Sequence, residues 1–467
     1  MKLLSGVAWS AVRGWGSRFI NLAVFFVAAR YLTPSELGVF SLVAAYLMIM
    51  QVLGEGGLAE YIVQRTELNP RQDQAIFYSQ LFSSGTIALL IAMVAPWVAP
   101  LLVKHADAVP LFIVSAITIP LTAVIRVPEA IMRKGLRFKA LAYRGLLTSG
   151  IAGVVTMFMA YRGFGIWALV VKQVLEAIID ALLIFIASRW NPGLPKFDRE
   201  VLKEPYAYGK HILGARLLDT LYLRIDTFLI GNFIGSAALG YYSVGQKIYQ
   251  ALIELLSKVF SNVAVPYMAR EKNNPEAVKK IYLQFVQLVA TIALPGFVYI
   301  FIFSPELIVL TFGAKWAEAA WILRSFCVLG AVNCVAFFNG YVLMAMGDSK
   351  SYFAVLIAKT IVLVVLCLIG VNFGIEGVVA AVVLGGILAT PFSYRKMRNW
   401  IPINVKDIAR ALTKGAVVAV LAGVVVVAIK LLLIQFHDIE KVAIGLVAFL
   451  LMMVGIHFGT GSRRLSI

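Results

Sequence analysis

Basic residues lie inside stretches of this 467-residue chain that otherwise read as membrane-spanning helix. A basic side chain at bilayer depth costs roughly 2.5–3.5 kcal/mol even on lenient insertion scales, so it is tolerated where it faces a water-filled cavity or a partner. Cations that line such a cavity would bind an anionic ligand. The eleven residues are Arg13, Arg18, Arg126, Arg144, Lys172, Arg216, Arg224, Lys247, Lys258, Arg324 and Lys359.

Helical spacing separates these cations into groups. Arg13 and Arg18 share an arc of about 140° with polar neighbours, and no acid lies on their helix, although snorkelling to the interface is an alternative for Arg13. Arg224 projects away from the nearby aspartates, and Lys247 lies on a polar stripe with spacings of three and four. These four are predicted to contact the ligand. Further candidates, each without an acid on its own helix, are Arg144, Arg324 and Lys359.

Acids inside the predicted spans suggest either ion coupling or internal ion pairs. Asp226, Glu176 and Asp180 are the candidates for a proton or sodium site. The alternative is pairing at helical spacings of three or four. Pairs of this kind are Lys172 with Glu176, Arg216 with Asp219 and Glu254 with Lys258, while Arg126, three residues before Glu129, is expected to snorkel. The eleven cations outnumber the six acids assigned to the spans, which favours an anionic cargo over a cationic one.

Other chemistries find little support in the sequence. Cys327, Cys334 and Cys367 form no CxxC pair, so we interpret them as buried thiols. The four histidines are scattered, and both HExxH and the phosphate-binding GxxxxGK[ST] motif are absent. We therefore predict no metal, no cofactor and no enzymatic activity. The formal charge of +18 is spread over short loops and helices, which disfavours nucleic acid as a partner.

Composition indicates an all-α polytopic membrane protein. Hydrophobic residues make up 61% of the chain, charged residues 14%, and the mean hydropathy is +0.88. Apolar runs of about 20 residues bounded by charges or turn residues predict about 14 transmembrane helices. They lie near 5–31, 35–60, 74–101, 108–128, 138–160, 163–188, 205–232, 236–265, 277–303, 317–346, 350–371, 375–394, 405–432 and 439–459.

The distribution of loop charges predicts the orientation. Of the 42 lysines and arginines, 25 fall at the termini or in loops on their side of the membrane and 6 fall in the opposite loops. By the positive-inside rule, both termini lie in the cytoplasm. The first helix has no small-residue cleavage site after a short apolar core, so we expect it to be retained.

An internal repeat predicts two lobes. LTPSELGVFSL at 32–42 matches IGSAALGYYSV at 234–244, and FGIWALVV at 164–171 matches FGIEGVVA at 373–380. Six helices per copy is an even number, so the copies share one orientation and are related by an axis along the membrane normal. The predicted divisions are a lobe at 1–190, a cytoplasmic linker at 191–204, a second lobe at 205–400 and two additional helices at 401–467.

Two stretches resemble a known family. Residues 28–65, AARYLTPSELGVFSLVAAYLMIMQVLGEGGLAEYIVQR, and residues 223–250, LRIDTFLIGNFIGSAALGYYSVGQKIYQ, resemble the polysaccharide transporter family of Wzx-type oligosaccharide flippases. That family belongs to one superfamily with the multidrug and toxin extrusion (MATE) proteins and the lipid II flippase. The resemblance covers about the first 400 residues. One departure is Glu55, which stands where aspartate is common in that family.

The resemblance implies a MATE-like fold of two six-helix lobes in the bacterial inner membrane. It also implies a cargo, an undecaprenyl-diphosphate-linked oligosaccharide repeat unit, which is flipped from the cytoplasmic to the outer leaflet for polysaccharide biosynthesis. A polysaccharide polymerase and other pathway proteins are possible partners besides the bilayer. The charge of a diphosphate suits arginine independently, because guanidinium groups bind phosphate oxygens with a bidentate fork.

Two alternatives belong to other functional classes. A MATE-like ion-coupled exporter of small molecules would share the fold, but for organic cations its cavity should be dominated by acids. A membrane enzyme of the same pathway should present catalytic groups in a sizeable outer loop, and the longest outer loop predicted here spans only about residues 304–316. Alternating access through a cationic cavity therefore remains the preferred mechanism.

Overall fold

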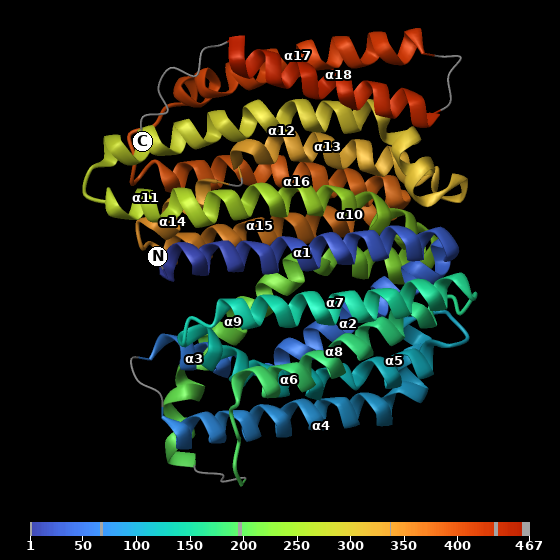
Figure 1. Cartoon of the computed structure of the whole chain (residues 1–467), viewed down its shortest axis with the longest axis vertical. Helices are drawn as coiled ribbons and strands as arrows, with labels where there is room; N and C mark the ends of the chain where they lie inside the picture. Colours follow the sequence, from blue (N-terminus) through green and yellow to red (C-terminus); the bar gives the residue numbers. More distant parts are fainter. Residues whose placement is uncertain (1, 66–68, 195–198, 337, 434–437, 460–467) are drawn as a thin grey trace. The chain divides into compact units, whose positions relative to one another are not determined.

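The computed structural model describes residues 2–65, 69–194, 199–336, 338–433 and 438–459 (Figure 1). Within these residues the chain forms helices and no β-strand, as the sequence predicts. Eight helical stretches of this part are long and apolar enough to cross a membrane. The protein is therefore an all-α, multi-pass membrane protein.

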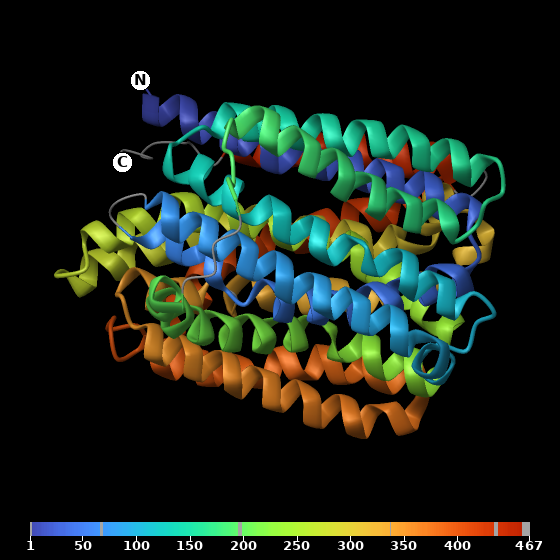
Figure 2. The same cartoon turned by 90° about the horizontal axis from the view of Figure 1, so that it is seen from below.

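The chain divides into two compact units, Met1–Gly240 and Tyr241–Ile467. In Figures 1 and 2 the first unit runs from blue to green and the second from yellow-green to red. The first contains α1 (Lys2–Tyr31), α2 (Pro34–Glu55), α3 (Leu58–Gln64), α4 (Pro70–Leu102), α5 (Ala108–Ala116), α6 (Thr118–Lys134), α7 (Phe138–Tyr161), α8 (Trp167–Ser188), α9 (Arg199–Leu229), a π-helical turn at Ile230–Ile234 and the first residues of α10 (Ser236–Val259).

The second unit contains the rest of α10 and the helices that follow it. They are a π-helical turn at Phe260–Ala264, α11 (Val265–Arg270), α12 (Pro275–Phe312), α13 (Ala319–Ala336), α14 (Asn339–Ala345), α15 (Ser349–Gly370), α16 (Gly374–Met397), α17 (Val405–Leu432) and α18 (Asp438–Gly459), with 3-10 turns at Ala314–Trp316 and Val371–Phe373.

Each of the predicted spans overlaps one helix or two consecutive helices. The span at 35–60 is divided because Gly56 and Gly57 adopt left-handed φ angles of 60° and 69°, which end α2 and begin α3. Helix α9 begins at Arg199, inside the stretch predicted as a linker. The apolar pattern thus locates the helices, while glycine conformation sets the break inside a span.

Side-chain caps fix several helix starts. Thr33 caps α2 in a reciprocal capping box with Glu36. Asn69 and Asn274 cap α4 and α12, and in both helices a proline occupies the first turn, where no N–H partner is needed. Asp348 caps α15 by accepting the N–H of Ser351 at 2.9 Å. Polar residues therefore delimit the long apolar segments.

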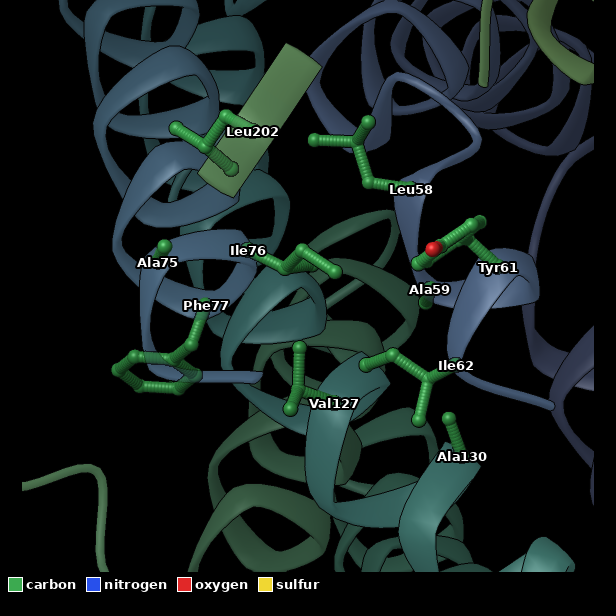
Figure 3. Packing of buried hydrophobic residues seen from close by; sticks show 10 residues of the cluster. All are labelled: Leu58, Ala59, Tyr61, Ile62, Ala75, Ile76, Phe77, Val127, Ala130 and Leu202. Carbon is green, nitrogen blue, oxygen red and sulfur yellow. The ribbon is translucent and has the colours of Figure 1, made fainter. Parts of the chain in front are cut away.

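Packing within each unit joins helices that are distant in sequence. In the first unit α1 packs on α7, and α6 packs on α4 and α8; in the second, α12 packs on α13 and α17, and α15 on α16 (Figures 1 and 2). A buried apolar cluster joins α3, α4, α6 and the start of α9 (Figure 3). Its members are Leu58, Ala59, Tyr61, Ile62, Ala75, Ile76, Phe77, Val127, Ala130 and Leu202.

The two matched repeat segments, 32–42 and 234–244, touch each other through equivalent residues. A Cβ on Gly38 would lie 1.7 Å from the carbonyl oxygen of Ser236, and a Cβ on Gly240 would lie 1.9 Å from that of Pro34. The hydroxyls of Ser35 and Ser236 are 2.7 Å apart. Because the offset of 202 residues relates Pro34 to Ser236 and Gly38 to Gly240, the contact is reciprocal, with glycine required on both sides.

Candidate functional site

Glu55, the last residue of α2, holds two arginines from other helices. Its Oε1 lies 2.7 Å from Nη2 of Arg126 on α6, and its Oε2 lies 3.0 Å from Nη1 of Arg216 on α9. Gln51 donates to Oε1 at 3.2 Å, and Gln80 donates to the backbone carbonyl of Glu55 at 2.6 Å. The residue is only 2% exposed, so its carboxylate is buried between the two guanidinium groups.

Arg216 also bridges to Glu60 on α3 through its second terminal nitrogen. This corrects the predicted pairing of Arg216 with Asp219 on the same helix, since the structure gives the guanidinium to Glu55 and Glu60 instead. The physical reason is that a buried carboxylate attracts a cation more strongly than an exposed one does, because the local dielectric is lower. Arg126 likewise pairs with Glu55, where simple snorkelling was expected.

Arg144 on α7 lies at the centre of a second ion cluster. Its Nη2 is 3.4 Å from Oε2 of Glu129 on α6, and its Nε is 3.1 Å from Oδ1 of Asp180 on α8. Glu129 also pairs with Arg133 at 2.7 Å, and Thr148 donates to Asp180 at 3.2 Å. Arg144 is 4% exposed. The sequence predicts it as a residue that contacts the cargo, but in the structure it is buried and joins α6, α7 and α8 through ion pairs.

The two clusters adjoin along α6 and their charges balance. Arg126 and Glu129 are one turn apart on that helix, and the residues that follow them, Val127 and Ala130, belong to the buried apolar cluster (Figure 3). The pairs are made by four arginines, Arg126, Arg133, Arg144 and Arg216, and four acids, Glu55, Glu60, Glu129 and Asp180. We call this set the first-unit ion network. Its chemistry is structural, because each arginine already faces a carboxylate.

Arg224 and Asp226 lie near the end of α9 and are not part of the first-unit ion network. Arg224 is half-buried, and its Nε is buried with no hydrogen-bond partner among the described residues. Asp226 is 4% exposed and accepts the backbone N–H of Thr227 at 2.6 Å. Within the described part of the chain, Arg224 makes no ion pair, so its guanidinium can receive an anion.

The remaining sequence candidates of the first unit lie on α1 and α8. Arg18 is on the exposed side of α1, and the side chain of Arg13 lies outside the described part of the structure. The predicted pair of Lys172 and Glu176 on α8 is present at 2.8 Å. Arg144 and Asp180 are therefore the candidates of this unit that the structure brings together.

In the second unit the candidate cations lie on three different helices. Lys247 is half-buried on α10. Arg324 on α13 donates from Nε to the carbonyl oxygen of Phe301 at 3.2 Å and lies 5.9 Å from the centre of that ring. Lys359 on α15 is half-buried and has no hydrogen bond or ion pair among the described residues. The side chain of Lys258, the predicted partner of Glu254, lies outside the described part.

Sequence reasoning missed the acids at the centre of the network. Glu55 and Glu60 lie inside the predicted span 35–60, but the six acids assigned to the spans from the sequence do not include them. The available signal was an acid beside two glycines within an apolar span, in a chain with an excess of membrane arginines. With these two included, the charge excess that suggests an anionic cargo is smaller, although it remains positive.

Metal-binding and thiol chemistry have no visible site in the described residues. No group of three or more histidine, cysteine or acidic side chains there is arranged to hold a metal ion. Cys327, Cys334 and Cys367 are buried and unpaired as disulfides, and burial among apolar side chains makes such thiols inert.

Comparison with known proteins identifies one family model and several relatives. The model described as polysaccharide biosynthesis protein matches residues 27–321. The teichuronic acid biosynthesis protein TuaB of Bacillus subtilis is 23% identical over 75% of this chain and 73% of its own length. The lipopolysaccharide biosynthesis protein WzxC of Escherichia coli is 20% identical over 84% of this chain and 80% of its own length.

Solved structures share the fold at low sequence identity. The lipid II flippase MurJ in an inward closed conformation superposes with a TM-score of 0.75 and 12% identity, covering 97% of this chain and 99% of that one. An inward-facing multidrug resistance MATE transporter superposes with a TM-score of 0.65 and 17% identity, covering 86% and 98%. The fold is therefore MATE-like and MurJ-like, as the sequence resemblance predicts.

Proposed function

This chain belongs to the polysaccharide biosynthesis protein family, and from that premise we propose that it flips an undecaprenyl-diphosphate-linked oligosaccharide repeat unit from the cytoplasmic to the outer leaflet. It is a multi-pass membrane transporter of the flippase type for cell-surface polysaccharide biosynthesis and not an enzyme. The names of its relatives refer to teichuronic acid, lipopolysaccharide and lipid II, which are all cell-surface glycans or their lipid-linked precursors.

The observation that carries the proposal is the half-buried Arg224 on a membrane helix, with no ion pair in the described part of the chain. The arginines of the first-unit ion network face carboxylates, whereas the guanidinium of Arg224 faces none among the described residues. A diphosphate offers several oxygen atoms to the bidentate N–H groups of a guanidinium, and these hydrogen bonds strengthen where water is partly excluded. Lys359 offers a second cation of this kind.

Transport would use the two copies of the repeat as rigid lobes. We assign residues 1–190 and 205–400 to six-helix lobes, joined by a cytoplasmic linker at 191–204 and followed by two additional helices at 401–467. The reciprocal contact of Gly38 with Ser236 and of Gly240 with Pro34 supports this assignment, because a two-fold axis brings equivalent residues face to face. Alternating access requires these equivalent segments to part when the cavity opens on their side.

A cross-link between the two repeat copies tests that motion. The hydroxyls of Ser35 and Ser236 are 2.7 Å apart, so the double variant Ser35→Cys/Ser236→Cys should form a disulfide on oxidation. We expect oxidation to lower flipping at least tenfold and reduction to restore it. Either single variant is the control, and the native thiols are buried. Full flipping by the cross-linked protein would exclude this contact as a gate.

Orientation, location and partners follow from the same proposal. Both termini would lie in the cytoplasm of a bacterium, with the chain in its inner membrane, as the excess of cytoplasmic loop cations predicts. Reporter fusions at the two termini test this arrangement. A polysaccharide polymerase would use the flipped cargo on the outer side and is the partner class to examine by co-purification.

Ion coupling, if present, would use an acid of the first unit. Asp226 is the candidate that lies on the same helix as Arg224, whereas Asp180 is held by Arg144 and Glu176 by Lys172. A proton or sodium gradient applied across proteoliposomes should accelerate flipping by the native protein. Asp226→Asn should flip at the same rate with and without the gradient if this carboxylate couples the ion.

Flipping in proteoliposomes tests the cargo directly. Labelled undecaprenyl-diphosphate oligosaccharide should reach the opposite leaflet with the native protein, and Arg13→Ala, Arg18→Ala, Arg224→Ala and Lys247→Ala should each slow it without preventing insertion. The alternative function, export of small molecules by ion coupling, predicts uptake of organic cations and no flipping. Normal flipping by all four variants would remove these residues from the cargo site.

A further inference from the structure

Two neighbouring cavities of the second unit differ in the charge of their linings. A pocket of about 220 Å³ is lined by Glu306 of α12, Val427, Lys430 and Leu431 of α17 and Lys441 of α18. A larger groove of about 610 Å³ runs along α12 and α17. Val427 and Leu431 line both, so the two lie next to each other. The groove is lined by Val298, Ala419, Val420, Gly423, Val424, Val427, Ala428 and Leu431.

The polar pocket holds the ammonium group of Lys430 in a fixed position. Nζ of Lys430 lies 2.6 Å from Oε1 of Glu306, donates to the carbonyl oxygen of Ile302 at 3.0 Å, and lies 5.5 Å from the centre of the Phe303 ring. These contacts hold the ammonium group in place. Glu306 keeps one buried oxygen, Oε2, to which no described group donates a hydrogen bond. Lys430 is therefore pre-positioned, and Glu306 has an unused acceptor.

Lys441 adds a cation that can change partner at little cost. Its Nζ is 3.2 Å from Oδ1 of Asp438, whose side chain is 51% exposed. Ion pairs with such an exposed partner contribute only about 0–1 kcal/mol, so an anion in the pocket can compete for this ammonium. The charged side chains that line the pocket itself, one acid and two lysines, sum to a single positive charge, which the exposed Asp438 beside Lys441 balances from outside the lining.

The apolar groove has the length of one membrane leaflet. Ala419 and Leu431 are twelve residues apart on α17, which corresponds to about 18 Å of helix at 1.5 Å per residue. The hydrocarbon core of one leaflet is about 15 Å deep. Gly423 lets α17 lie close to α12 at the groove, because a Cβ there would approach Val298 of α12 to 3.2 Å. A hydrocarbon chain can thus lie in the groove while its polar end reaches the lysines.

We propose that this composite cavity is a binding site for one anionic phospholipid. Its phosphodiester, with one negative charge, would lie between Lys430 and Lys441, and one acyl chain would follow the groove between α12 and α17. A headgroup hydroxyl beside Glu306 would supply the donor that its Oε2 lacks. Phosphatidylglycerol has this combination of a single negative charge and hydroxyl donors.

A bulk phospholipid fits this site better than the proposed cargo does. A diphosphate carries about two negative charges where the pocket offers one positive charge in excess. The inference goes beyond the proposed flipping activity and does not depend on it, because it requires only that the protein spans a membrane.

Native mass spectrometry and thermal unfolding of the detergent-purified full chain test the site with phosphatidylglycerol and phosphatidylcholine as probes. We expect one phosphatidylglycerol per chain, with an affinity at least tenfold above that for phosphatidylcholine. Lys441→Gln removes a phosphate contact and Ala428→Trp fills the groove, so each should weaken phosphatidylglycerol binding about tenfold. Ala428→Leu is the substitute if the tryptophan variant does not fold.

Matched controls isolate the site from general effects. Lys104→Gln removes an exposed cation elsewhere, and Val417→Trp adds the same bulk to an exposed position of α17 outside the groove. Both should bind phosphatidylglycerol as the native chain does. Equal affinity for the two phospholipids, or unchanged binding by Lys441→Gln and Ala428→Trp, would overturn the proposal. Tighter binding of undecaprenyl diphosphate at the same site would overturn it as well.

Discussion

Three arginines of the first-unit ion network and two candidate cations of the second unit are accommodated by different means. In the first unit Arg126, Arg144 and Arg216 each meet a carboxylate from another helix. In the second unit Arg324 is held by a carbonyl oxygen and a ring, and Lys359 has no ion pair among the described residues. A buried ion pair fixes helices together, whereas an incompletely neutralised cation is available to a ligand. Arg126, Arg144 and Arg216 thus join helices through ion pairs, whereas Arg324 and Lys359 meet no carboxylate among the described residues.

The largest effect should come from breaking the first-unit ion network. Arg144→Met leaves Glu129 without one cation and Asp180 without its arginine in a buried site, which should cost about 3–5 kcal/mol of unfolding free energy. Arg324→Met, the matched change in the second unit, loses one hydrogen bond to a carbonyl and should cost about 1 kcal/mol. Unfolding of the purified variants in detergent measures both. Equal losses would remove the contrast between the units.

Glu55 sharpens the comparison because it serves two arginines at once. Glu55→Gln keeps the volume but removes the charge, and should cost roughly 2–3 kcal/mol. The double variant Glu55→Gln/Arg216→Gln should be less unstable than the sum of the two single variants, since each single change strands the other charge. Strict additivity in the unfolding free energies would argue that the pair is not coupled.

Replacement of Lys359 should reduce flipping without reducing stability, whereas replacement of Arg144 should mainly reduce stability. Removing a half-buried cation that has no ion pair in the described chain relieves a desolvation cost, so Lys359→Met should leave stability unchanged or raise it by about 1 kcal/mol. Flipping should nevertheless fall about tenfold, because one charge-assisted contact to the cargo is lost. A variant that is destabilised yet flips normally would assign Lys359 to structure instead.

A helix cap outside the membrane gives the smallest expected effect. The N–H of Ser351, and then the indole N–H of Trp400, hold the pKa of the Asp348 carboxyl below its usual range. Because the folded-state pKa is lowered, this stabilisation is present above the unfolded pKa and is lost as the pH falls through the folded pKa. Asp348→Ala should cost about 0.5–2 kcal/mol at neutral pH.

The pH dependence of unfolding tests whether the ionised carboxyl of Asp348 stabilises α15. The difference between Asp348→Ala and the native chain should shrink as the carboxyl becomes protonated at acidic pH. A difference that stays constant across the acid range would mean that the ionised carboxyl is not the stabilising form.

The sequence predicts the helices well because each helix is specified by a local run of apolar residues. Long apolar runs are local, so the spans could be located without knowledge of their neighbours. Breaks within spans were harder: the apolar pattern continues through Gly56 and Gly57, and only their left-handed backbone angles separate α2 from α3. The match between residues 32–42 and 234–244 also pointed to segments that touch in the structure.

The candidate site was less predictable because its partners are distant in sequence. Pairing at helical spacing correctly gave Lys172 with Glu176 and wrongly gave Arg216 with Asp219. Arg216 and Glu55 are 161 positions apart, and a helical wheel contains no information about such a contact. Arg144 looked unpaired for the same reason, since both of its acids lie on other helices.

The central claim is that Arg224, which makes no ion pair in the described part of the chain, binds the diphosphate, while the arginines of the first-unit ion network stabilise the fold. Its most direct test is the flipping rate of labelled undecaprenyl-diphosphate oligosaccharide by Arg224→Ala, compared with Arg144→Met at a temperature where both variants remain folded. We predict that Arg224→Ala flips at least tenfold more slowly at unchanged stability, while folded Arg144→Met flips near the native rate. Native flipping by Arg224→Ala, together with loss of flipping by folded Arg144→Met, would contradict the account.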